Sequence, residues 1–302
     1  MMLSKYVVVT VTYNREQLLR KCIHQLEHQT VPANKIIIVN NASTDGTSAF
    51  LTKISSQYHF LYQIIECSEN IGGAGGFAKG IEAALQYDTN FILILDDDAL
   101  LSEDYVEKLL NAKKQYPQYC AFAGNVKVNG EIDICHRRTL SKIGLLTKEC
   151  TEHMYLDKYF ECDVASFCGM LVEKNLVEVI GLPHAEYFIW HDDVEYSLRI
   201  HKFSKFLIVS DAILDHRTNI NIAGYHSRRY EWRDYYAVRN RILYVKEHGK
   251  LIDRLINGID LFFRVVLRNW IFSLIKKDGY NWNYEKKLVR KAIRDALYEK
   301  VY

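Results

Sequence analysis

The segment NFILILDDDALLSEDY, residues 90–105, decides the fold. Its apolar run Phe91–Leu95 has the length and the β-branched residues of a buried strand, and it leads directly into Asp96, Asp97 and Asp98. Three adjacent carboxylates repel one another, and each is costly to hold away from water unless a positive group neutralises it. The segment therefore predicts a buried strand that ends at a metal ion, a basic partner or open water.

Strand and helix patterns alternate on either side of this segment. Expected strands are 6–11, 35–39, 61–66 and 91–95, and expected helices are 15–27, 46–57, 75–85 and 103–114; two further strands, outside this alternation, are expected at 166–173 and 206–209. Strands joined by helices of this length form right-handed crossovers, so the predicted fold class is α/β, a mainly parallel sheet flanked by helices. Ligands of such sheets bind beyond the carboxyl ends of the strands. Polar residues follow all four strands, so we expect them to converge on one edge.

Composition and charge narrow the class of protein. The chain has 302 residues, 49% of them hydrophobic, which is enough for one large domain with an appendage. Its seven cysteines are scattered and never spaced as CxxC, so we expect a reducing, cytoplasmic compartment and no zinc ribbon. The apolar run at the N-terminus is too short for a signal peptide and is expected to be the first strand.

The C-terminal part is basic. From residue 226 onward there are 18 Lys and Arg against 9 Asp and Glu, a net charge of +9, whereas the whole chain carries +2. Residues 249–302 are expected to form a basic, amphipathic helical extension after a main domain at 1–248. Within the extension, 259–275 places Asp260, Arg264 and Arg268 on one helical stripe, so it is not expected to span a membrane. Peripheral contact with the inner face of the cell membrane and burial of the apolar stripe in a homodimer both fit. Only charge favours nucleic acid, which we do not expect.

Four motifs can carry chemistry. Acids spaced by one residue at a strand end, as Asp96 and Asp98 are, suit Mg²⁺ or Mn²⁺ held together with substrate phosphates. Capping of the next helix is the other explanation, but Ser102 and its acidic neighbours are expected to serve there. Glycines at 72, 73, 75 and 76 allow close backbone approach, and the helix that follows could offer free N–H groups to an anion.

The third motif is YFIWHDDVEYSLR, residues 187–199, and the fourth is the histidine of AILDHRTN. Either Asp192 or Asp193 could cap the helix that follows, but two acids are more than a cap requires. A carboxylate beside a metal could act as general base for group transfer. On sequence alone His216 is expected to be structural.

With these residues in view, the chain resembles the inverting, nucleotide-sugar-dependent family 2 glycosyltransferases of the GT-A fold. VTVTYNR, IIIVNNASTDGT and the DxD motif ILDDDA carry the resemblance. NIGGAGGF, WHDD, the later histidine and YYAVRNRILYV resemble the galactofuranosyltransferase-like and rhamnosyltransferase-like branch. The resemblance covers about residues 5–248.

The resemblance implies a role for each matching residue. Asp96 and Asp98 would hold Mn²⁺ or Mg²⁺ with His216 completing the metal shell, and Asp193 would be the general base. Trp190 and Asp192 would shape the acceptor pocket, and Arg239 and Asn240 would support the donor site. The donor nucleotide would lie against Thr12, Arg15, Asn40, Asp45, Asn70 and Asp96.

The resemblance also implies an activity. The expected function is transfer of a sugar, with galactofuranose favoured, from a UDP-sugar to a hydroxyl of a cell-surface polysaccharide or lipid-linked glycan. A dTDP-rhamnose-dependent rhamnosyltransferase and a non-catalytic nucleotide- or glycan-binding subunit are the alternatives. A nucleotidyltransferase or an NAD-dependent dehydrogenase would need a glycine turn after the first strand, where this chain has TYNREQ.

Overall fold

The computed structural model describes residues 5–217, 231–267, 270–271 and 282–298, in two compact units. The first unit comprises residues up to 139, 149–188 and 193–219, and the second comprises 140–148, 189–192 and 220–302. Helix α7 lies in the second unit. The predicted boundary of the main domain at residue 248 stays a prediction.

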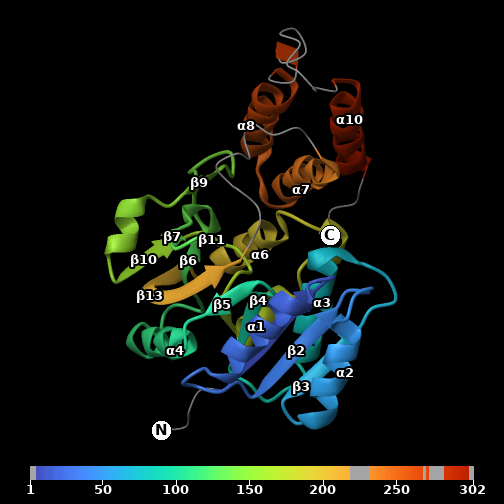
Figure 1. The fold of residues 1–302 in the computed structure, drawn as a ribbon. Helices are drawn as coiled ribbons and strands as arrows, with labels where there is room; N and C mark the ends of the chain where they lie inside the picture. Colours follow the sequence, from blue (N-terminus) through green and yellow to red (C-terminus); the bar gives the residue numbers. More distant parts are fainter. Residues whose placement is uncertain (1–4, 218–230, 268–269, 272–281, 299–302) are drawn as a thin grey trace. The chain divides into compact units, whose positions relative to one another are not determined.

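A mixed, mainly parallel sheet forms the centre of the first unit (Figure 1). Its main path has the order β10-β13-β6-β12-β4-β1-β2-β3, and β5 and β7 pair with β13 and β6. The neighbours β3, β2, β1 and β4 run parallel, as expected for right-handed crossovers, while β12 runs antiparallel to β4 and β6. The sheet strands are β1 (Tyr6–Thr12), β2 (Lys35–Asn40), β3 (Tyr62–Glu66), β4 (Phe91–Asp96), β5 (Ala99–Leu101), β6 (Ala121–Val128), β7 (Glu131–Ile132), β10 (Tyr159–Cys162), β12 (Met170–Glu173) and β13 (Phe206–His216).

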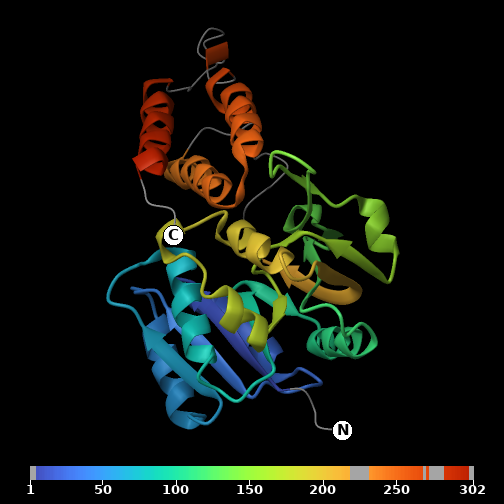
Figure 2. The same ribbon diagram turned by 180° about the vertical axis from the view of Figure 1, so that it is seen from behind.

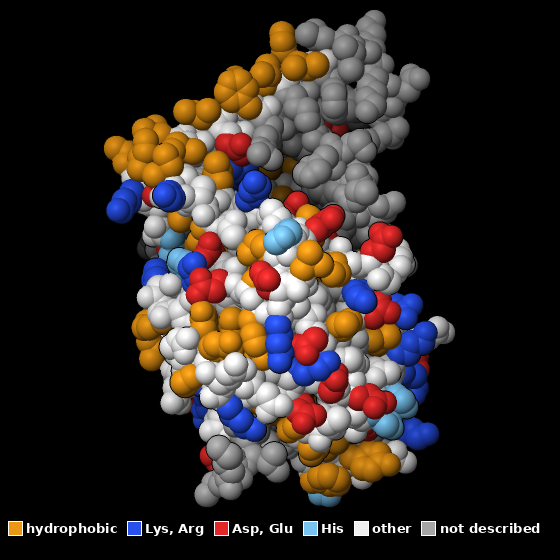
Figure 3. Space-filling model, turned by 90° about the vertical axis from the view of Figure 1, so that its left-hand side faces the viewer, with side chains coloured by type: hydrophobic (Ala, Val, Ile, Leu, Met, Phe, Trp, Pro, Cys, Tyr) orange, Lys and Arg blue, Asp and Glu red, His pale blue; other side chains and the backbone are white. Residues whose placement is uncertain are grey.

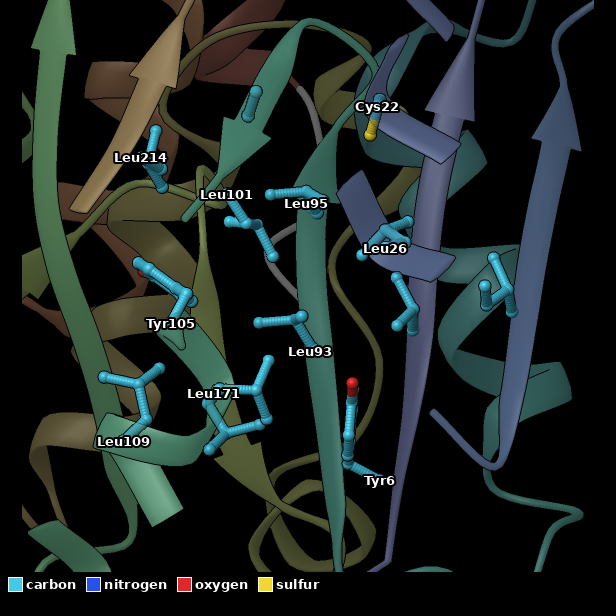
Figure 4. Close-up of a cluster of buried hydrophobic side chains, with 14 of the residues drawn as sticks. Tyr6, Cys22, Leu26, Leu93, Leu95, Leu101, Tyr105, Leu109, Leu171 and Leu214 are labelled. Atoms are coloured by element: carbon cyan, nitrogen blue, oxygen red, sulfur yellow. The ribbon is translucent and has the colours of Figure 1, made fainter. Parts of the chain in front are cut away.

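Helices cover both faces of this sheet (Figures 1 and 2). Strand residues alternate between the faces, so Tyr6 and Val8 lie in one apolar cluster and Val7 and Val9 in the other. The first cluster, drawn in Figure 4, packs the sheet against α1, α2 and α4, and the second packs it against α3, α5 and α6. These helices are α1 (Glu16–Glu27), α2 (Thr47–Gln57), α3 (Gly72–Ala84), α4 (Tyr105–Gln115), α5 (Lys174–Ile180) and α6 (Asp192–His201).

A small second sheet and short helical turns lie outside the central sheet. The sheet has the order β11-β8-β9, with β11 at Val164–Ala165, β8 at Arg137–Leu140 and β9 at Thr147–Glu149. Three 3₁₀ turns are η1 (Ile134–His136), η2 (Glu152–Leu156) and η3 (Ala185–Tyr187). The predicted α/β fold class is thus confirmed, and solved GT-A structures described below share it.

Helices form most of the second unit. Val238 of α7 (Trp232–His248) packs with Leu288, Val289 and Ala292 of α10 (Trp282–Tyr298) in a small apolar cluster. Helix α8 (Leu251–Leu261) runs on into a π-helical segment, η5 (Phe262–Leu267). The predicted amphipathic segment 259–275 therefore begins as helix, and its residues 268–269 and 272–275 lie outside the described part of the chain.

Candidate active site

The parallel strands bring their polar C-terminal residues to one edge of the sheet. The registers place Thr12 beside Asn40, and Asp96 beside Val11. Asp97 and Asp98 follow in a turn and are almost fully buried. The guanidinium of Arg15, at the N-terminus of α1, donates to Asp97 Oδ1 at 3.1 Å and to Asp98 Oδ2 at 2.7 Å. Arg15, which we expected near the donor nucleotide, is thus the basic partner of two of the three acids.

The three carboxyls differ in their electrostatics. Burial raises the pKa of Asp96 to about 6, although the charges of His216 and Arg15 oppose the rise. Burial also raises the pKa of Asp97 to about 7 against the charge of Arg15. For Asp98, burial acts in the same direction, but the hydrogen bond and charge of His216 and the charge of Arg15 outweigh it and lower its pKa. Asp96 and Asp97 are therefore the acids for which the surrounding charges do not compensate the cost of burial, whereas Asp98 is compensated.

His216 ends β13 beside the acids. It pairs with Ala99 in the register between β13 and β5, and its Nε2 lies 3.0 Å from Asp98 Oδ1. Burial lowers the pKa of His216, but the hydrogen bond to Asp98 and the charges of Asp98 and Asp96 outweigh this and raise it. The predicted association of Asp96, Asp98 and His216 is therefore present in the geometry.

Ligand atoms of Asp96, His216 and Cys168 lie within 4.8 Å of one another. Carboxylate oxygens and an imidazole nitrogen suit Mn²⁺, and the undercompensated Asp96 is a carboxylate that a cation would stabilise. The residues present therefore fit a divalent cation. No motif distinguishes Cys168 from the other six cysteines, so its position beside these ligands was not predicted.

Arg137 and His136 were also not predicted to belong to the site. Arg137 is fully buried and donates to the carbonyls of Gly124 at 3.1 Å and Cys168 at 3.1 Å, so it fixes the segment that carries Cys168. The His136 ring lies edge-on to His216, with ring centroids 5.2 Å apart. Burial and the charge of His216 hold the pKa of His136 well below its usual value. His136 therefore stays neutral beside the charged cluster.

Asp193 is the residue expected to act as general base. Its Oδ1 accepts a hydrogen bond from the backbone N–H of Val194 at 2.7 Å in the first turn of α6, so the helix-capping explanation holds in part. Burial raises the pKa of Asp193, while the charges of Arg138 and Arg137 oppose the rise. The charge of Asp193 also contributes to the raised pKa of Asp96.

The backbone just before Asp193 is strained. Phe188, Trp190 and His191 have φ of 63°, 64° and 64°, a region that non-glycine residues rarely occupy. Within the second unit, Asn240 is fully buried, and its Nδ2 donates to the carbonyls of Ile189 at 3.1 Å and Trp190 at 2.8 Å. The late Arg-Asn pair thus holds this strained turn, since Arg239 in turn donates to Asn240 Oδ1.

Most of the other residues predicted to bind the donor nucleotide make hydrogen bonds within the protein. Asn40 donates to Ser48 and Glu66, both at 2.7 Å, and Asn70 Oδ1 accepts from Asn41 Nδ2 and from the Gly72 N–H, both at 2.9 Å. Asp45 accepts from the backbone N–H groups of Thr47 and Glu16 and so serves the N-termini of α2 and α1. Thr12 is buried beside Asp97. Asn40 and Asn70 therefore order the loops after β2 and β3.

The glycine-rich segment differs from its prediction. The N–H groups of Ile71, Gly72 and Ala74 donate to Asn41, Asn70 and Phe188, so they are not free for an anion. Close packing explains the glycines better, because a Cβ on Gly76 or Gly80 would come within 2.5 Å of a side chain of β1. The expectation of free N–H groups at this turn was wrong.

The helix cap after the acids also differs. Helix α4 begins at Tyr105, and the side chain of its capping residue Asp104 accepts no hydrogen bond from the backbone N–H groups of the helix. Ser102 Oγ instead donates to Asp104 Oδ1 at 3.0 Å. The expected helix start at Glu103 was too early because Ala99–Leu101 form strand β5.

A mixed, mainly parallel sheet with an acidic cluster at the carboxyl edge of its parallel strands agrees with the GT-A glycosyltransferase class that the sequence resembles. The model of the family "Glycosyl transferase family 2" matches residues 7–181. The chain belongs to this family, which confirms the predicted class of enzyme.

Curated relatives agree with the family. The chain is 26% identical over 207 residues to a putative glycosyltransferase, EpsH, of Bacillus subtilis, a match that covers 66% of this chain and 56% of EpsH. It is 31% identical over 119 residues to a putative teichuronic acid biosynthesis glycosyltransferase, TuaG, of the same organism, which covers 38% and 44%. The chain thus spans about half or less of the length of these relatives.

Solved structures share the fold. GalNAc-T7, solved with UDP, GalNAc and Mn²⁺, matches with a TM-score of 0.68 at 14% identity, covering 98% of this chain and 55% of that one. S. aureus TarS 1-349, solved with UDP-GlcNAc, matches with a TM-score of 0.57 at 17% identity, covering 97% and 80%. Among the described residues, no helix is long and apolar enough to cross a membrane.

Proposed function

We propose that the chain is an inverting, divalent-cation-dependent glycosyltransferase. It would transfer a sugar from a UDP-sugar to a hydroxyl of a cell-surface polysaccharide or lipid-linked glycan, with galactofuranose the favoured sugar. The observation that carries the proposal is the cluster at the carboxyl edge of the sheet: ligand atoms of Asp96, Cys168 and His216 lie within 4.8 Å of one another, and His216 Nε2 lies 3.0 Å from Asp98 Oδ1. These groups suit a cation bound to a diphosphate, and Asp193, at the start of α6, is the carboxylate assigned to act as base.

The residues divide the chemistry between them. Asp193 takes the proton of the acceptor hydroxyl as its oxygen bonds to the anomeric carbon, and the bond from that carbon to the diphosphate breaks on the opposite side. Burial raises the pKa of Asp193, which makes its carboxylate a stronger base than an exposed one. Asp96, Asp98 and His216 would hold Mn²⁺ or Mg²⁺, which neutralises charge that develops on the leaving diphosphate.

The choice of donor rests on two kinds of support. UDP accompanies two of the similar folds, GalNAc-T7 and TarS, which favours UDP as the nucleotide. The motifs NIGGAGGF, WHDD and YYAVRNRILYV support the galactofuranosyl-like or rhamnosyl-like branch. A poly-β-1,6-N-acetyl-D-glucosamine synthase of Staphylococcus aureus, 25% identical over 122 residues, and TuaG support a polysaccharide acceptor.

Thermal melting with nucleotides tests the donor and the cation together. The protein is melted with UDP, dTDP, GDP or NAD, each with Mn²⁺, with Mg²⁺ and with EDTA. A ligand that binds only the folded state stabilises it by about 2.7 kcal/mol at a hundredfold excess over Kd, so modest affinity is visible. We expect a shift with UDP that requires the cation. A cation-dependent shift with dTDP alone would favour the rhamnosyl donor.

Matched variants make the test specific. Asp96→Ala and His216→Ala should lose the cation-dependent part of the UDP shift, and Asp211→Ala, an exposed acid on β13, should keep it. A wild-type shift in Asp96→Ala or His216→Ala removes that residue from the cation site. UDP binding without transfer of galactofuranose or rhamnose to any glycan hydroxyl would favour the non-catalytic binding subunit.

A further inference from the structure

Helix α8 presents an apolar face to solvent. Leu251, Leu255 and Ile259 are spaced four residues apart on one stripe, with Ile252 beside them, and their exposed fractions are 73%, 55%, 58% and 49%. Phe262 and Phe263, directly after the helix, are exposed to 51% and 56%. Figure 3 shows hydrophobic side chains gathered near its upper edge, at the height where Figure 1 places α8. We call these six residues the α8 apolar face.

The side of α8 that faces the protein carries buried polar residues beside two apolar ones, Ile256 next to Gly144 and Leu261 against the cluster of α7 and α10. Asp253 and Asn257 are both buried, and they bond to the backbone of Gly144: Asp253 Oδ1 accepts from its N–H at 2.6 Å, and Asn257 Nδ2 donates to its carbonyl. Asp260 pairs with Arg241 at 2.6 Å. A surface helix of a water-soluble domain normally buries its apolar side, whereas α8 buries Asp253 and Asn257 and leaves four of its six Leu and Ile residues exposed. This arrangement indicates that the apolar face meets something other than water.

Helix α10 of the same unit carries a stripe of cations. Lys287, Arg290, Lys291 and Arg294 are all exposed and recur at three- and four-residue intervals, as residues on one helical face do. The opposite face, with Leu288, Val289 and Ala292, packs in the cluster with α7. We call these four cations the α10 basic stripe.

The acids of α8 and α10 offset only one cation of the α10 basic stripe. Asp253 is bonded to Gly144, and Asp260 is paired with Arg241. On α10, Glu285 is buried, and Asp295 accepts from Tyr235 and pairs with Arg294 at 3.0 Å. Lys250 and Arg254 are exposed beside the α8 apolar face. Helix α8 therefore presents an apolar face with cations beside it, and α10 presents a basic stripe.

We propose that the second unit docks on a membrane surface rich in anionic lipids. The α8 apolar face enters the headgroup region, and the cations of α8 and α10 bind lipid phosphates, a combination typical of helices that lie in the interface. A second copy of the chain fits less well, because a twofold interface presents the same surface twice and would bring two cationic rims together.

Vesicle flotation tests the docking. Full-length protein is mixed with vesicles of phosphatidylglycerol and phosphatidylcholine, or of phosphatidylcholine alone, at low and high salt. We expect flotation with the anionic vesicles that weakens at high salt and on removal of the anionic lipid. The double variant Leu255→Ser, Ile259→Ser should lower the partition coefficient between vesicles and water by about tenfold or more, because two apolar side chains that would enter the interface are lost. Arg290→Glu with Lys291→Glu should lower it on anionic vesicles.

Matched controls come from the first unit, and neither pair belongs to the catalytic site. The double variant Leu156→Ser, Phe203→Ser removes two apolar side chains that are at least as exposed as Leu255 and Ile259. The double variant Lys53→Glu, Lys202→Glu makes the same change in charge as the α10 variant. Both should leave flotation unchanged. Absence of flotation, or equal loss in the controls, overturns the proposal. Light scattering that shows a dimer broken by Leu255→Ser, without flotation of the wild type, would assign the face to a second copy instead. Vesicle binding is measured without donor sugar, so its failure is distinct from failure of the transferase.

Discussion

Replacing Asp96 with Asn is expected to stabilise the metal-free protein at pH 8. Burial raises the pKa of this carboxyl from 3.8 to about 6, so the fold favours its protonated form. The contribution of Asp96 to stability is therefore fully present below about pH 4 and is lost as the pH rises to about 6, where the folded state must give up its proton. A pKa difference of that size corresponds to about 3 kcal/mol at pH 8, which the uncharged amide would recover.

Asp98, two residues along, provides a control of opposite sign. Its pKa is lowered because His216 and Arg15 outweigh burial, so its ionised form stabilises the fold at neutral pH. Asp98→Asn should therefore destabilise the protein at pH 8. The assay is urea denaturation followed by circular dichroism in EDTA, at pH 8 and at pH 4.5, where the gain from Asp96→Asn should shrink. Destabilisation of similar size by both variants at pH 8 would refute this account of the two acids.

Three further predictions concern catalysis, cation binding and packing. Asp193→Asn should abolish sugar transfer and leave cation-dependent UDP binding, measured by calorimetry, nearly unchanged, because only the base is lost; equal loss of both would refute its role as base. Cation affinity should fall as the pH drops from 8 to 6, because Asp96, with a pKa of about 6, and His216, with a raised pKa, take up protons that a cation must displace; calorimetric titration with Mn²⁺ checks this, and a constant affinity over that range would contradict it. Gly80→Ala should destabilise the protein by about 1–3 kcal/mol, because its Cβ would lie 2.4 Å from a side chain of β1, whereas Gly73→Ala meets nothing within 4 Å and should be tolerated; equal urea midpoints for the two variants would contradict the packing argument.

Periodicity predicted most of the parallel half of the sheet. The apolar runs of β1, β2, β3 and β4 are continuous and are separated by helical patterns, so their bounds agree with the structure to within about a residue. Strand β13 was harder. It was expected to end at Val209, because the polar pair Ser210-Asp211 looks like a break, yet an irregularity between Val209 and Ile213 absorbs these residues and the strand continues to His216.

The site residues were likewise predictable where they follow regular strands and unpredictable where they lie in irregular segments. Carboxylates that follow a strand are visible in the sequence, so Asp96 and Asp98 could be placed from their spacing. Arg137 and Cys168 lie in segments without a regular period. They reach the acids through two antiparallel pairings, of β8 with β11 and of β12 with β4. The segment 166–173, expected as one strand, is divided by Gly169, whose φ is +80°. Asn240 could not be connected to the turn at Trp190, because the two are linked by a hydrogen bond across 50 residues of chain.

The contact between His216 and Asp98 also has a consequence for the order of folding. The two residues are 118 positions apart, and they meet because β13 pairs with β5 and β6 at the far side of the sheet from β1, β2 and β3. Pairing at such a sequence distance requires closure of a long loop, which is slow compared with formation of the local β-α-β units. A nascent chain that ends before residue 206 therefore holds the acids without their histidine. Formation of this contact marks the point at which the central sheet is complete.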